Sequence, residues 1–204
     1  MNIYFDTEFT GLKKNTDLIS IGMVTEDNKF FYAEITDIKY EDLDEWIKKN
    51  VIYNSLFLSL TEEEKEKTLN EISDSLDDDS VIMYGTKEEV SKVINDWLKE
   101  ISKGDIIQFV SDVEAYDTVL LFDIITNGKT ALELPENITA DVVNINLLLA
   151  MKKSISLKEA FDINRESLID TDKVKEILGV DYELKHNSLW DAIVILEISK
   201  ILDL

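Results

Sequence analysis

Short runs of alternating or β-branched residues fill the first part of the chain. They cover residues 3–9, 18–25 and 29–35, and turn-rich pieces at 11–17 and 26–28 separate them. Alternation with a period of two is typical of strands, and short polar connections are typical of hairpins. The pattern therefore predicts three consecutive antiparallel strands at the start of the fold.

Helical periodicity then takes over, interrupted by short strand-like runs at residues 81–84, 105–111 and 139–142. Apolar positions spaced by three or four residues predict helices at 40–49, 61–76, 87–101, 113–126, 144–151, 156–161, 172–178 and 189–202. This order indicates an α/β domain, a mixed sheet covered by helices. One proline and six glycines leave no flexible linker, so we expect residues 1–204 to form a single domain.

The first predicted strand carries two acids in an otherwise apolar run, IYFDTEF. Because side chains alternate along a strand, Asp6 and Glu8 lie on one face with Tyr4. Two neighbouring carboxylates repel each other, and burying them is costly without a cation or hydrogen-bond donors between them. The strand is therefore either an edge with a wet face or a place where something positive binds.

Two further acids lie within apolar helix faces. Asp117 falls inside the arc formed by Tyr116, Leu120 and their neighbours, and Asp191 shares a stripe with Val194 and later apolar residues. Helix periodicity therefore predicts that both side chains point into the fold.

Each of these acids also has an ordinary structural interpretation. Ser188 with Asp191 matches a helix-capping pattern, and Asp117 could bind backbone amides near the start of its own helix. Together with Asp6 and Glu8, however, four inward carboxylates on three elements are hard to explain as separate caps. Carboxylate oxygens with one or two waters are the ligands that Mg²⁺ and Mn²⁺ accept, so we expect a divalent metal site.

Two other acid pairs have the same spacing as Asp6 and Glu8. Asp112 and Glu114 lie at a helix start, where side chains two apart diverge, and Asp181 and Glu183 lie in a polar segment without strand flanks. We interpret both pairs as lying outside the site.

His186 is the only histidine, five residues before Asp191 in KHNSLWDA. If Asn187 or Ser188 caps the last helix, His186 belongs to the preceding loop and can fold over the same pocket. Nearby carboxylates would then raise its pKa towards working pH, which suits a general base that takes a proton from water. The alternative is an ordinary surface or core histidine.

The charge and composition exclude several classes of protein. A net charge of −22 with one arginine, Arg165, argues against tracking along a long duplex, although it allows an acidic, metal-filled pocket for the end of a short strand. Acidic runs are usually solvated, with a calcium site at residues 77–79 as an alternative. The chain lacks cysteine, a basic leader and a long apolar run, so we expect a soluble, cytoplasmic protein without membrane contact.

These residues resemble the motifs of the DEDD exonucleases, in the histidine-containing branch of the ribonuclease H-like superfamily. The first motif is similar to DTEFTGL at residues 6–12, followed by LISIGMV; the second is similar to Tyr116-Asp117; and the third to His186 with Asp191 five residues later. The matches run in the family's order along nearly the whole chain. The segment before Asp117, SDVEAY, departs from the family pattern and leaves Asp112 as the fallback ligand.

The resemblance implies a ribonuclease H-like mixed sheet with helices on both faces, and a 3′–5′ exoribonuclease similar to oligoribonuclease. Asp6, Glu8 and Asp191 would hold one of two Mg²⁺ or Mn²⁺ ions, Asp6 and Asp117 would hold the second, and His186 would deprotonate water. Phe9, Leu12 and Thr10 would contact the 3′ end of single-stranded nucleic acid. Related enzymes are often dimers, so the resemblance also allows a homodimer.

Two alternatives to the exoribonuclease stay open. The motifs do not separate RNA from DNA, so a 3′–5′ DNA exonuclease of the proofreading type fits the same residues. A catalytically inactive binding module of the same fold is the second alternative. Ordinary core packing is the simpler interpretation of Phe9 and Leu12.

Overall fold

The computed structural model describes all residues except 41–42, 74–75, 77 and 204. A six-stranded sheet in the order β4-β3-β2-β1-β5-β6 forms its centre. The first three strands pair antiparallel, whereas β4 pairs with β3, β5 with β1 and β6 with β5 in parallel. The strands are β1 (Asn2–Phe9), β2 (Leu18–Thr25), β3 (Phe30–Ile35), β4 (Val81–Gly85), β5 (Gln108–Ser111) and β6 (Val143–Asn144).

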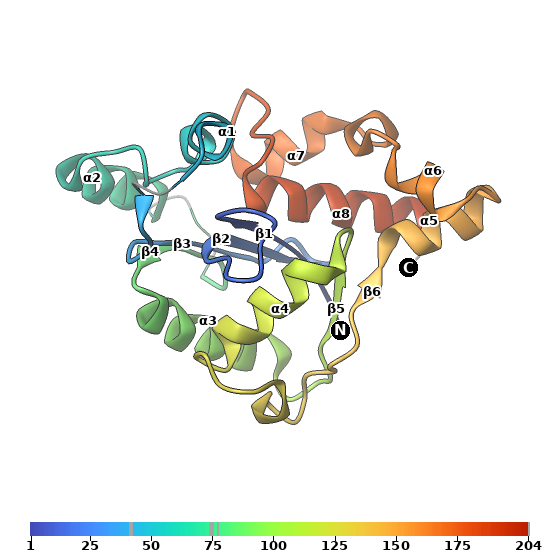
Figure 1. Ribbon diagram of the computed structural model, residues 1–204, viewed down its shortest axis with the longest axis horizontal. Helices are drawn as coiled ribbons and strands as arrows, with labels where there is room; N and C mark the ends of the chain where they lie inside the picture. Colours follow the sequence, from blue (N-terminus) through green and yellow to red (C-terminus); the bar gives the residue numbers. More distant parts are fainter. Residues whose placement is uncertain (41–42, 74–75, 77, 204) are drawn as a thin grey trace.

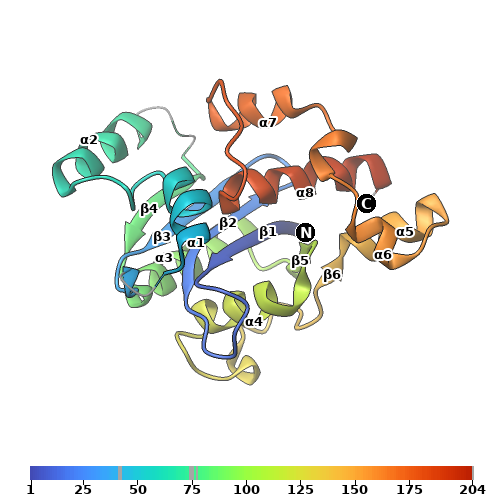
Figure 2. The same cartoon turned by 45° about the horizontal axis from the view of Figure 1, so that its top comes forward.

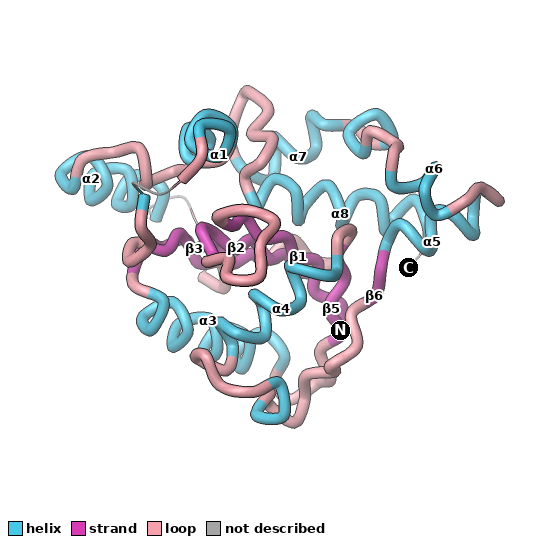
Figure 3. The backbone as a smooth tube through the Cα atoms, viewed as in Figure 1, coloured by secondary structure: helices cyan, strands magenta, loops and turns pink. Residues whose placement is uncertain are grey.

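Helices cover both faces of this sheet (Figures 1 and 3). One face packs against α8 and the other against α3 and α4, which gives two separate apolar cores. The α-helices are α1 (Glu45–Asn50), α2 (Glu62–Ser73), α3 (Lys87–Ser102), α4 (Glu114–Ile125), α5 (Ile145–Lys153), α6 (Leu157–Phe161), α7 (Thr171–Leu178) and α8 (Ser188–Leu202). Short 3₁₀ turns are η2 (Ile52–Asn54), η3 (Ala131–Glu133) and η4 (Arg165–Leu168).

The predicted α/β architecture is confirmed, with three antiparallel strands first and helices on both faces. Alternation also placed the faces of β1 correctly: Tyr4 belongs to the core under α8, and Ile3 and Phe5 belong to the opposite core. Among the described residues, no helix combines the length and apolar character needed to cross a membrane.

Two predicted elements were misplaced. The strand expected at 139–142 is wrong, because Ile138 makes only an isolated bridge to Ile107 and the paired residues of β6 come later, at 143–144. The helix expected from residue 40 begins only at Glu45, where Asp44 accepts a hydrogen bond from the Ile47 N–H (2.9 Å) and caps it. Residues 41–42 of that prediction, and 74–75 of the predicted helix 61–76, lie outside the described residues.

Gly22 on β2 lets α8 approach the sheet closely. A Cβ atom at this position would lie 2.3 Å from the backbone nitrogen of Leu189, far inside a normal contact. Gly22 also pairs with Asp6 across β1 and β2. The start of α8, which carries Asp191, therefore packs against β2 at the residue that pairs with the first acid of β1. Figure 2 shows α8 lying over the sheet.

We expect Gly22→Ala to destabilise the fold by about 3 kcal/mol, because the new methyl group meets rigid backbone and must push α8 off the sheet. Chemical denaturation of the purified variant measures this loss. Gly85→Ala is the matched control: its Cβ would meet the flexible Glu89 side chain at 3.1 Å, so the loss is expected to be small. Equal losses in the two variants would contradict this account.

Candidate functional site

Acidic residues gather where β1 and β5 end. The two strands are parallel neighbours, so their carboxyl ends lie at the same edge of the sheet. Tyr4 pairs with Val110; Asp6 stands two residues further along β1, and Asp112 follows the last residue of β5. Parallel pairing therefore brings an acid from the end of β5 to the acids of β1.

A cavity of about 350 Å³ opens at this edge. The residues that the sequence predicted as catalytic all line it: Asp6, Glu8, Asp117, His186 and Asp191. A larger hollow of about 630 Å³ lies beside α3 and the end of α4. We favour the smaller cavity because buried and half-buried acids from β1, α4 and α8 converge there, which is the chemistry expected of a functional site.

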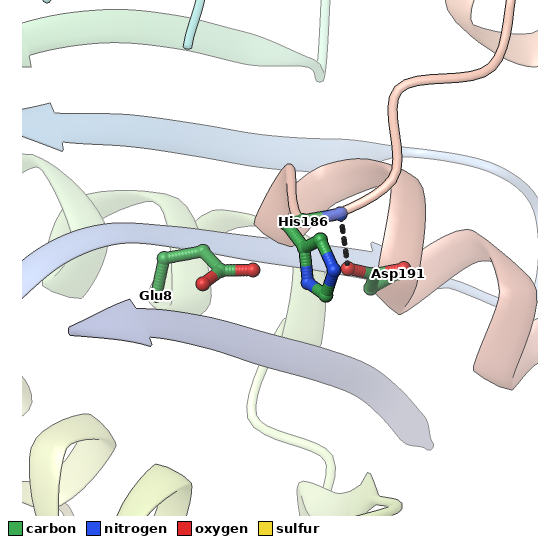
Figure 4. Close-up of side chains that lie close together, drawn as sticks. All are labelled: Glu8, His186 and Asp191. Atoms are coloured by element: carbon green, nitrogen blue, oxygen red, sulfur yellow. Dashed lines mark hydrogen bonds between the residues drawn. The ribbon is translucent and has the colours of Figure 1, made fainter. Parts of the chain in front are cut away.

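Glu8, His186 and Asp191 form the first group of side chains. Their potential ligand atoms all lie within 4.8 Å of one another, and the imidazole lies between the two carboxylates (Figure 4). The backbone N–H of His186 donates to Asp191 Oδ2 at 3.2 Å.

The loop position of His186 follows from the capping of α8. Asn187 caps the helix by accepting hydrogen bonds from the N–H groups of Leu189 and Trp190, so His186 precedes the helix as expected. The capping pattern of Ser188 with Asp191 is not formed, because the Ser188 hydroxyl contacts Ser20 Oγ at 3.0 Å. Asp191 thus supports its loop through one oxygen and still lines the cavity.

Asp6, Asp112 and Asp117 form the second group, again with ligand atoms within 4.8 Å of one another. The Asp117 side chain is only 2% exposed and accepts a 2.5 Å hydrogen bond from the Thr7 hydroxyl. Thr7 alternates with Asp6 and Glu8 on β1, so it reaches α4 from the opposite side of the strand. The inward direction predicted for Asp117 is confirmed.

The interpretation of Asp112 as lying outside the site is wrong. Its carboxylate lines the cavity, and Arg165 Nε lies 2.6 Å from its Oδ2, although this N–H is not aligned for a hydrogen bond. Asn146 fixes the pair, because it donates to the Asp112 carbonyl (2.6 Å) and accepts from an Arg165 guanidinium nitrogen (2.9 Å). Helix periodicity missed Asp112 because its place depends on the pairing of β5 with β1.

Asn164, Arg165 and Glu166 also line the cavity and were missed by sequence reasoning. Only the uniqueness of Arg165 in so acidic a chain could have singled out this segment. The remaining acid pair behaves as expected, because Asp181 and Glu183 are exposed and do not line the cavity. The side chain of Glu114 lies outside the described part of the chain, as does Asp77 of the calcium alternative, and Asp78 and Asp79 are exposed.

Burial and mutual repulsion raise the pKa values of the clustered acids. Burial, followed by the neighbouring carboxylates, raises the pKa of Asp6 and that of Glu8 well above their ordinary values. Burial is also the main cause that raises the pKa of Asp117 to about 7 and that of Asp191 to about 8. Such a set of crowded hard-oxygen donors suits a divalent cation, which removes both penalties.

We expect the metal-free protein to gain stability as the pH falls from about 8 to about 5. In the folded protein the pKa of Asp117 is about 7 and that of Asp191 is about 8, whereas the ordinary value is 3.8. The two acids therefore bind protons more tightly in the folded state than in the unfolded state. Their contribution is complete below the unfolded pKa and is lost as pH rises through the folded values. Thermal melting with a chelator measures this trend, and Asp117→Asn should weaken it. A melting temperature that decreases as the pH is lowered from about 8 to about 5 would contradict the burial of these acids.

The expected upward shift of the His186 pKa is wrong. Although the His186 side chain is exposed at its outer edge, partial burial of the ring lowers its pKa, and this effect exceeds the raising effect of Glu166. A pKa below the ordinary value of about 6.5 favours the neutral form of the imidazole at pH 7. A neutral ring can accept a proton, so the role of His186 as a general base stays a prediction.

The structure separates the three residues predicted to contact substrate. Phe9 lines the cavity and stacks on Tyr116, with ring centroids 5.3 Å apart. Thr10 instead closes the loop after β1: its backbone N–H donates to the Asp17 carbonyl, and its hydroxyl accepts from the Asp17 N–H. Leu12 is 79% exposed and does not line the cavity, so core packing is excluded for it.

Comparison with protein-family models and with curated proteins finds no match to this chain. Any assignment of function therefore rests on the geometry of the cavity and on the motifs quoted above.

Proposed function

We propose that the protein is a metal-dependent 3′–5′ exoribonuclease of the ribonuclease H-like type. It would release nucleoside 5′-monophosphates from the 3′ end of short or single-stranded RNA. The observation that carries the proposal is the convergence of Asp6, Glu8, Asp117, His186 and Asp191 on one cavity. The mixed sheet is compatible with this fold type.

Two Mg²⁺ or Mn²⁺ ions fit the donor set of the cavity. Glu8 and Asp191 offer one group of carboxylate oxygens, and Asp6, Asp112 and Asp117 offer the other. When bound, the ions would activate water and stabilise charge on the phosphodiester. The charges of Glu8, Asp112, Asp117 and Asp191 all raise the pKa of Asp6, so this acid is close to both groups.

His186 is the proposed general base. Its neutral ring lies between Glu8 and Asp191 (Figure 4), where it can accept a proton from the attacking water. The water oxygen bonds to phosphorus, the bond from phosphorus to the 3′ oxygen breaks, and the leaving oxygen takes a proton from solvent. Glu8 and Asp191 flank the ring, and the bond from the His186 N–H to Asp191 fixes the backbone that carries it.

The walls of the cavity favour the end of a flexible single strand. Phe9, supported by Tyr116, offers a flat apolar surface on which a terminal base can stack without sequence preference. Arg165, the one arginine, is occupied by Asp112, and the chain carries a net charge of −22. These features disfavour a long basic track for nucleic acid. The preference for RNA and a homodimeric state rest on the motif resemblance.

A labelled-oligomer assay tests the function. Purified protein is incubated with a 5′-labelled single-stranded RNA and with DNA of the same sequence, in Mn²⁺ or Mg²⁺. We expect stepwise shortening of the RNA from its 3′ end and slower shortening of the DNA. Neither oligomer should be shortened when a chelator removes the metal. The same RNA labelled at its 3′ end should release the labelled 5′-monophosphate at once.

The other outcomes select among the alternatives. Faster shortening of the DNA would support the proofreading type of exonuclease. Cleavage of circular RNA would indicate an endonuclease instead. Binding of oligomers without any cleavage in either metal would support the inactive binding module and overturn the proposal.

A further inference from the structure

Glu34 is a buried acid that the proposed reaction does not use. It lies on β3 with no exposed surface and does not line the cavity. Its carboxylate accepts hydrogen bonds from four donors: the Tyr32 hydroxyl (2.6 Å) and the backbone N–H groups of Leu56 (2.5 Å), Phe57 (3.0 Å) and Leu58 (2.9 Å). A fully buried charge with so many donors requires a reason.

The three backbone donors fix the segment that follows η2. Within η2, Asn54 reaches across to the loop before α8: its side chain donates to the Lys185 carbonyl at 2.6 Å. Its own carbonyl accepts from the Asn187 side chain at 3.1 Å. Glu34 is thus connected through Asn54 to the residues on either side of His186.

A second route from Glu34 reaches the same loop. The Tyr32 hydroxyl, while donating to Glu34, accepts from the Asn187 side chain at 3.0 Å. The other side-chain atom of Asn187 caps α8. Both routes therefore end at residues adjacent to His186.

His186 depends on these neighbours for its position. Its side chain is exposed, and its backbone is left-handed, with φ of 60°. Its ring packs in a T-shaped arrangement with Trp46 on α1, with centroids 5.1 Å apart. The helix α1 lies beside the loop before α8 in Figures 1 and 2. Non-glycine residues populate this conformation sparsely, so the contacts of the loop must offset its cost at His186.

We propose that Glu34 is a positioning residue for His186. The proposal rests on the function given above. Glu34 holds Tyr32 and the segment after η2, these hold Asn54 and Asn187, and the loop then presents the imidazole between Glu8 and Asp191. A glutamine at position 34 would set an amide NH₂ group against donors that need an acceptor, so the tether would loosen.

Glu34→Gln tests this inference with two measurements. We expect kcat to fall about tenfold or more, the scale for outer-shell partners, with little change in KM or in Mn²⁺ affinity. Because His186 is the only histidine, its imidazole gives one isolated NMR signal, which should shift and broaden in the variant. Asn54→Ala, which removes the bond to Lys185 but no buried charge, should change the signal in the same direction and is the milder variant.

Asn95→Ala is the matched control. Asn95 also ties two segments together, by donating to the Ser91 and Ile125 carbonyls, but it lies on α3 away from the cavity. We expect lower stability with unchanged kcat and histidine signal. An unchanged histidine signal in both Glu34→Gln and Asn54→Ala, or the same change in Asn95→Ala, would overturn the proposal. If the unaltered protein cleaves no oligomer, the proposed function fails, while the histidine signal still decides the positioning role.

Discussion

Asp6→Asn and Asp191→Asn should each lower the rate of RNA hydrolysis by more than about 100-fold, because loss of even an outer-shell partner of a metal costs 10–100-fold. Asp6 belongs to one group of potential ligands and Asp191 to the other. Loss of either acid therefore removes a donor that the second group cannot replace. The assay is single-turnover cleavage of a labelled RNA oligomer in Mn²⁺.

The same variants should be more stable than the unaltered protein when no metal is bound. Repulsion among Glu8, Asp6 and Asp191 penalises the folded state, and an amide in place of one acid relieves it. Melting in chelator should show a higher temperature, and melting in excess Mn²⁺ should show a smaller metal-induced gain. Asp181→Asn, with the same change of charge at an exposed position, is the control for both measurements. Full activity in Asp6→Asn or Asp191→Asn would remove the basis for the assigned site.

His186→Ala should lower kcat by about 10²-fold or more, the usual scale for a lost general base. KM and Mn²⁺ affinity should change little if the ring acts mainly as a base, because the carboxylates stay in place. Steady-state kinetics with a titration of Mn²⁺ separates these quantities. Tyr182→Ala, an exposed change on the same loop, should leave all three unchanged.

The pH dependence supplies a second readout for His186. At saturating Mn²⁺, which keeps the ligand carboxylates ionised, the base must be neutral, and partial burial lowers its pKa below the ordinary value of about 6.5. The decline of kcat that the ring causes should therefore lie in acid below that value. His186→Ala should lose the part of the decline that the ring causes. A large loss of metal affinity in His186→Ala, with kcat restored at saturating Mn²⁺, would instead assign the ring as a metal ligand.

The tethering of the His186 loop gives a physical reason for a buried charge that does not line the cavity. Metal-free acids at the edge of the sheet weaken the fold, and Glu34 adds the burial of a further charge, which also raises its pKa. Its four donors offset that cost. We infer that stability is exchanged here for the placement of a loop.

The architecture was largely predictable because local periodicity controls it. The alternation in 3–9, 18–25 and 29–35 predicted the antiparallel strands, and the apolar faces of α4 and α8 predicted that Asp117 and Asp191 point inward. The misplaced strand at 139–142 shows the limit of this method, because a strand forms only where a neighbour pairs with it and β6 contains two residues.

The sequence by itself determined that Asp6, Glu8, Asp117 and Asp191 lie within apolar faces, because alternation on a strand and the 3.6-residue repeat of a helix group these acids with apolar neighbours. Only the tertiary structure decided that Asp112 joins them, that Arg165 pairs with it, and that Glu34 is tied to the His186 loop. Each of these depends on segments that are distant in sequence, paired through parallel strands or through hydrogen bonds to loop backbone. No periodic pattern in the sequence predicts such pairings, because the packing of the whole domain selects them.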